Sequence, residues 1–162
     1  IVMNDSFAVL AGSAVLSIAA VALPAASVHA QDAKSVAGTY AVVTQPVFGE
    51  NPQGQLILGG DGRYSLILFR GDLPKVAAGP RDKGTAEENK SIVAGSIAHY
   101  GKYSVDAKAK TLTFNIEGGT YANWNGTAQT RALKVVGDQL SYNISAPSAG
   151  TVPVDAVWKR VK

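Results

Sequence analysis

Short runs in which apolar and polar residues alternate are the feature that most limits how this chain can fold. Leu112, Phe114 and Ile116 alternate with polar residues, and the pattern recurs from Leu140 to Ile144. A period of two places successive side chains on opposite faces of a strand, so that one face can be buried. Because turn signals separate the runs, the pattern favours an all-β barrel or sandwich over βαβ units.

Eight segments fit this description. They are residues 37–44, 54–60, 63–70, 99–106, 110–117, 128–136, 139–146 and 152–161. Gly59-Gly60-Asp61-Gly62 and Gly137-Asp138 supply the positive φ angles of tight hairpins. The chain has 162 residues, 46% of them hydrophobic, which suits a single domain with its own core. We therefore predict an all-β fold, an eight-stranded antiparallel barrel with one short helix.

That helix is predicted at about 85–97. Thr85-Ala86-Glu87-Glu88 forms a capping box, in which the threonine hydroxyl and the Glu88 carboxylate satisfy free backbone donors. Ile92, Val93 and Ile97 would form its apolar stripe. The preceding loop, 71–84, is long and rich in Pro and Gly, and its Leu73 and Val76 would suit a flap over a barrel mouth.

The first 30 residues form a separate, hydrophobic leader. They contain 21 apolar residues, and no charged residue occurs from Phe7 to Val28. Pro24 ends the apolar run, and small residues follow, so we expect a signal peptide cleaved after Ala30 and a domain over 31–162. The usual basic start is missing, and an uncleaved membrane anchor is the alternative, because 22 uncharged residues could span a bilayer. A cleaved leader predicts an exported protein, periplasmic or secreted, with no remaining membrane segment.

Charge and residue usage narrow the possible chemistry. Without the leader the chain carries 15 Lys and Arg against 11 Asp and Glu, scattered without a basic run, so we expect no nucleic-acid partner. Cysteine is absent, and His99 is the one histidine outside the leader. A structural zinc site is therefore not expected, and we predict no metal, no other cofactor and no assigned catalytic residue.

Aromatic residues near the predicted strand ends are the best candidates for a binding site. Tyr100, Tyr103, Tyr121 and Trp124 could line a cavity and also donate hydrogen bonds, and Arg131 would stand near the same rim. Trp158, within the last predicted strand, is better explained by core packing.

A series of short motifs runs in order along residues 36–161. They are Gly38-Thr39-Tyr40, Pro52-Gln53-Gly54-Gln55-Leu56, Asp61-Gly62-Arg63-Tyr64, Tyr100-Gly101-Lys102-Tyr103, Trp124-Asn125-Gly126, Arg131, Gly137-Asp138-Gln139-Leu140 and Trp158-Lys159-Arg160. Together they resemble the bacterial and fungal lipocalin-like domain, a calycin-type β-barrel. The resemblance implies that Tyr40 and Arg160 close one end of the barrel by stacking a cation on a ring. Tyr40 stands where the family more often has Trp, and Phe114 where it often has His.

Three functions remain open from the sequence. The first is an exported barrel that binds a small apolar or amphipathic molecule, which requires an interior that is partly empty. The second is a non-catalytic envelope module that presents loop 71–84 as an exposed patch. The third is an isomerase or cyclase type of enzyme, which would bring Glu117 or His99 together with Tyr103 and Arg131 in one cavity.

Overall fold

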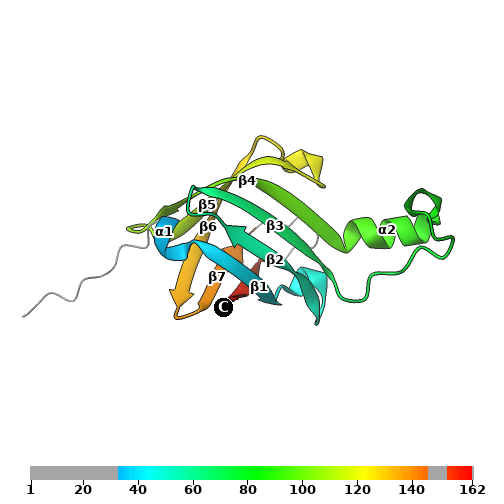
Figure 1. Ribbon diagram of the computed structural model, residues 1–162, viewed down its shortest axis with the longest axis horizontal. Coiled ribbons are helices and arrows are strands. Elements are labelled where there is room, and N and C mark those ends of the chain that lie inside the picture. Colours follow the sequence, from blue (N-terminus) through cyan, green and yellow to red (C-terminus); the bar gives the residue numbers. More distant parts are fainter. Residues whose placement is uncertain (1–32, 146–152, 162) are drawn as a thin grey trace, which may run out of the picture.

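Eight antiparallel strands close into one barrel in the computed structural model, which describes residues 33–145 and 153–161 (Figure 1). Each strand pairs with its neighbours in chain order, and β1 pairs with β8 to complete the cylinder. The strands are β1 (Gly38–Thr44), β2 (Pro52–Leu58), β3 (Arg63–Arg70), β4 (Ser96–Asp106), β5 (Thr111–Gly119), β6 (Ala128–Val136), β7 (Gln139–Ile144) and β8 (Val154–Arg160). The predicted fold class is confirmed.

Some predictions fall on other parts of the chain. The leader with its cleavage site at Ala30, and the positions 146 and 152 of two predicted strands, lie outside the described residues. Within the described residues, the helices are too short or too polar to cross a membrane.

The alternating pattern decides which side chains enter the barrel. Leu112, Phe114 and Ile116 on β5 are buried, and so are Leu140 and Tyr142 on β7, whereas their neighbours along each strand are more exposed. One face of each pleated strand therefore packs in the core, and the opposite face is in contact with solvent. The interior is consequently built from every second residue of each strand.

One end of the barrel is closed by the short helix α1 (Ala33–Val36) and by two side chains from paired strands. The Tyr40 hydroxyl donates a hydrogen bond of 2.7 Å to the Val36 carbonyl. The Arg160 guanidinium lies over the Tyr40 ring, 4.8 Å from its centroid, and donates a hydrogen bond to the Ala37 carbonyl. These contacts attach the start of the domain to its last strand.

Gly38 provides the space that Arg160 occupies at this closed end. A methyl group at Gly38 would collide with the Arg160 guanidinium. We expect Gly38→Ala to displace the guanidinium from the Tyr40 ring and to lower the free energy of unfolding by about 1–2 kcal/mol, measured by urea denaturation. Gly60→Ala is the matched control, because no atom lies within 4 Å of the added methyl. Equal losses in the two variants would contradict this role of Gly38.

The helix differs from its prediction at its C-terminal end. The Thr85 capping box is present, but α2 covers only Ala86–Ala94 and ends at Gly95. Ile97 belongs to β4, because residues 96–102 pair with β3 and this pairing uses the backbone groups that a longer helix would need. Val93 is 76% exposed and no residue of α2 is buried. The predicted apolar stripe is therefore wrong, and α2 projects from the barrel at the end away from α1 (Figure 1).

Loop 71–84, which precedes α2 in the chain, does not form the predicted flap over the cavity. The Glu88 carboxylate accepts hydrogen bonds from the backbone N–H groups of Ala77 (3.0 Å) and Thr85 (2.8 Å), which hold the loop against α2. Leu73 lies beside Gly95. Neither Leu73 nor Val76 lines the cavity described below.

Candidate functional site

A cavity occupies the half of the barrel opposite α1. Its walls come from strands β3 to β7 and from two short 3-10 helices, η1 (Pro46–Phe48) and η3 (Ala122–Trp124), with the residue before η1. The lining residues are Gln45, Val47, Phe48, Leu66, Leu68, Ile97, His99, Phe114, Trp124, Gln129, Arg131, Tyr142 and Ile144. Most are apolar or aromatic, as is usual for small-molecule sites.

The cavity is narrow. Its volume is about 40 Å³. That is enough for at least one water molecule, which needs roughly 10–15 Å³, but far below the roughly 300–1,000 Å³ of a typical small-molecule pocket. The interior is thus partly filled by its own side chains. A slender group can enter it, and a broader guest requires lining side chains to change rotamer.

Aromatic side chains form one wall as a connected cluster. The Phe114 ring centroid lies 4.6 Å from that of Tyr64 and 5.6 Å from that of Tyr142. The His99 ring meets Trp124 edge to face at 5.8 Å. Edge-to-face packing of this kind is a favourable arrangement of aromatic rings, and it connects the side chains of this wall to one another.

Arg131 is the charged residue of the cavity. It lies on the inward face of β6 and is only 8% exposed. Its Nη2 donates a hydrogen bond to Gln129 Oε1, two residues along the same strand. Burial lowers the pKa of Arg131 and the nearby Tyr142 hydroxyl opposes this effect, but a guanidinium stays protonated at neutral pH.

His99 and Tyr64 form a second polar pair at the cavity wall. The Tyr64 hydroxyl oxygen lies 2.8 Å from His99 Nδ1, and the tautomer decides which of them donates. Burial, followed by the positive charge of Arg131, lowers the pKa of His99 to about 4. Burial also raises the pKa of Tyr64. At neutral pH both groups are uncharged, so the cavity keeps the single positive charge of Arg131.

The predicted site residues are divided among three places. Trp124 and Arg131 line the cavity, and Tyr121 contacts Trp124 edge to face at 5.4 Å without lining the cavity itself. Tyr100 lies on the outer face of β4, where its ring covers Gly118 and its side chain is 54% exposed. It points outward because it is adjacent to His99 on the strand, and His99 points inward. The predicted place of Tyr100 at the rim is wrong.

Tyr103 faces inward but at the closed end of the barrel. Its hydroxyl lies within hydrogen-bond distance of the carbonyl oxygens of Ala33 (2.9 Å) and Gly59 (2.8 Å). It does not line the cavity. Its predicted place at the rim is also wrong, because β4 is long enough to reach both ends of the barrel and Tyr103 belongs to the far half.

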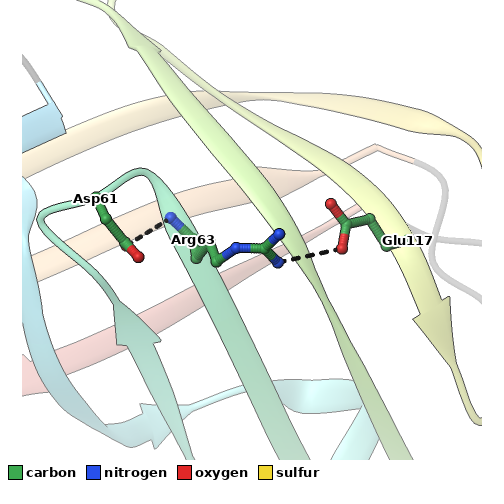
Figure 2. A network of polar contacts seen from close by, with 3 residues as sticks. All are labelled: Asp61, Arg63 and Glu117. Atoms are coloured by element: carbon green, nitrogen blue, oxygen red, sulfur yellow. Dashed lines mark hydrogen bonds and ion pairs between the residues drawn. The ribbon is translucent and has the colours of Figure 1, made fainter.

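Glu117 lies outside the barrel. Its carboxylate forms an ion pair of 3.3 Å with Arg63, whose backbone N–H donates to the Asp61 carboxylate at 3.0 Å (Figure 2). The pair spans the outer face of β4, and both side chains are substantially exposed, so it contributes little to stability. The isomerase or cyclase hypothesis needed Glu117 or His99 to meet Tyr103 and Arg131 in one cavity. The cavity contains His99 and Arg131, but neither Glu117 nor Tyr103 lines it.

Several lining residues were not anticipated from the sequence. Gln129 could have been predicted to line the interior, because it alternates with Arg131 and Leu133 on one face of β6. The apolar Leu133 marks that face as the buried one. Gln45 is buried and caps η1 by accepting a hydrogen bond of 2.9 Å from the Val47 N–H. No local pattern distinguishes such a glutamine from a surface one.

Comparison with known proteins agrees with this architecture. A family model described as a lipocalin-like domain matches residues 27–161, which include every strand of the barrel. No curated protein matches the chain. The family and the barrel together support a ligand-binding role in general.

Proposed function

Because the chain belongs to the lipocalin-like domain family, we propose that its barrel binds a small apolar or amphipathic molecule in the cavity lined by Trp124 and Arg131. The observation that carries this proposal is an apolar cavity containing one buried, charged side chain. Apolar walls supply roughly 25 cal/mol for each Å² of ligand surface that they remove from water. A few polar groups then orient the ligand.

The cavity favours binding over the alternatives. An interaction module that presents loop 71–84 has no need of an open cavity on the inside of the barrel. Catalysis at a carboxylate would need Glu117, which pairs with Arg63 on the outside. His99 reaches the cavity, but its partner there is Tyr64 and not an acid. We further propose, from the leader sequence alone, that the protein performs this role after export.

Native mass spectrometry of the full chain, expressed in a host that exports it, tests both parts of the proposal. We expect a mass corresponding to residues 31–162 with a small molecule retained in the cavity. A protein that carries no ligand when isolated, and that binds none of a panel of apolar and amphipathic compounds, would overturn the binding function. A mass that includes the leader would overturn cleavage after Ala30.

A further inference from the structure

The cavity holds a buried cation whose hydrogen-bonding capacity is largely unused. A guanidinium has five N–H donors. Among the described residues, Arg131 uses one of these for Gln129, and no Asp or Glu lies within 4.0 Å of it. The other described arginines that lie on strands are partnered differently: Arg63 and Arg70 pair with carboxylates, and Arg160 stacks on Tyr40.

An unpaired buried charge is costly, and folded proteins normally compensate it with an opposite charge. Arg131 lines the cavity and is close enough to His99 and Tyr142 to affect the pKa of both. Because His99 is neutral at pH 7, it does not add to this charge, and no described carboxylate cancels it. The compensating anion can therefore be part of the ligand.

We propose that Arg131 binds the carboxylate of a slender amphiphile whose apolar chain lies against the aromatic wall of the cavity. This inference rests on the proposed binding function and specifies its ligand class. A guanidinium and a carboxylate are planar and can form two parallel hydrogen bonds. The Gln129 side chain, hydrogen-bonded to Nη2, keeps the guanidinium on the cavity side of β6.

The dimensions of the cavity favour a linear chain as the apolar part. Phe114, Tyr142 and Leu66 lie around the inner half, and Phe48 and Trp124 lie nearer its mouth. The interior is narrow, so any guest longer than a few atoms requires lining side chains to change rotamer. An alkyl chain needs less of this rearrangement than a fused ring system, because it is narrower and flexible.

Three eight-carbon probes that differ only at the head group test the charge. We expect isothermal titration calorimetry at pH 7 to give octanoate a dissociation constant roughly 10- to 100-fold lower than that of 1-octanol, the usual gain from a hydrogen-bonded charge. Octylammonium is expected to bind more weakly than the alcohol. Octyl sulfate, a bulkier anion, is expected to bind more weakly than octanoate.

Two arginine variants provide the matched comparison. Arg131→Met is expected to abolish the preference for octanoate while leaving 1-octanol binding intact, which also shows that the variant is folded. Arg63→Met removes an equal charge from the outer surface (Figure 2) and is expected to keep the wild-type preference. Because the probe series is first measured on the unmodified protein, the result does not depend on either variant.

The outcomes separate the inference from the function on which it rests. Equal affinity of the unmodified protein for octanoate and 1-octanol would overturn the carboxylate assignment and leave apolar binding in place. Tighter binding of octyl sulfate than of octanoate would overturn carboxylate in favour of another anion. Failure of all four probes and of the wider panel would overturn the proposed function itself.

Discussion

The free energy of unfolding is expected to fall by about 3 kcal/mol as the pH drops from about 6.5 to about 4, because of His99. Burial, and then the charge of Arg131, disfavours the protonated imidazole in the folded protein. Between these pH values the unfolded chain binds a proton at His99 that the folded barrel does not bind. The stabilisation due to neutral His99 is therefore complete above about pH 6.5 and is lost progressively as the pH falls below that value. Below about pH 4 the folded protein is also protonated at His99, so the contribution of this residue does not change further.

Urea denaturation at half-unit pH steps measures this dependence, and His99→Gln is the matched variant. Glutamine can still hydrogen-bond to the Tyr64 hydroxyl but does not titrate. Carboxylates such as Asp72 and Glu88, whose pKa values are lowered by hydrogen bonds, destabilise both proteins alike at the acid end of the range. The difference between the two curves isolates His99. If the two curves run parallel from pH 7 to pH 4, the imidazole is solvated in the folded protein and the assigned environment is wrong.

Trp158→Ala is expected to cost about 3–5 kcal/mol of the free energy of unfolding, the usual range for deleting a fully buried aromatic side chain. Trp158 has no exposed surface. Its ring stacks on Tyr142 at a centroid distance of 6.4 Å, and its backbone lies opposite Leu140 on β7 and Val42 on β1. Because β8 closes the cylinder, a void at this position weakens the packing of both neighbouring strands.

The second tryptophan of the chain provides the control. Trp124 lines the cavity and is only partly buried. Because folding removes less of its apolar surface from water than in the case of Trp158, Trp124→Ala is expected to lower the free energy of unfolding by roughly 1 kcal/mol or less. It should instead weaken the binding of octanoate and 1-octanol together. Urea denaturation of the two variants, combined with calorimetry, separates the roles. Similar losses of stability in both would contradict the assignment of Trp158 to the core and Trp124 to the site.

The approximate positions of the strands were predictable because their signals are local. Alternation over residues 111–117 and 139–144 reflects the geometry of a single strand, and the Gly59–Gly62 and Gly137–Asp138 turns need only their own backbone angles. The Thr85 capping box is local in the same sense and is present. The C-terminal end of α2 was not predictable, because Ile97 joins β4 through pairing with Leu68, which is far away along the chain.

The candidate site was predicted only in part, because a binding site depends on contacts between distant segments. Trp124 and Arg131 were named as site residues and lie at the cavity, whereas Tyr100 points outward and Tyr103 lies at the opposite end. The alternation along one strand predicts whether a residue faces inward or outward, but not whether it lies near the open or the closed end of the barrel.

The sequence by itself determined that this chain forms about eight antiparallel strands of an all-β domain, since alternation and turn chemistry act between neighbouring residues. Closure into a cylinder depends on the pairing of β1 with β8, which are far apart along the chain. Only the tertiary structure decided which inward residues surround open space and which fill it. It also decided which charges meet a partner: β4 separates Arg63 from Glu117 yet lets them pair across its outer face, while Arg131 enters the interior with no carboxylate beside it among the described residues. Electrostatic pairing depends on distance through space, and closing the barrel sets that distance.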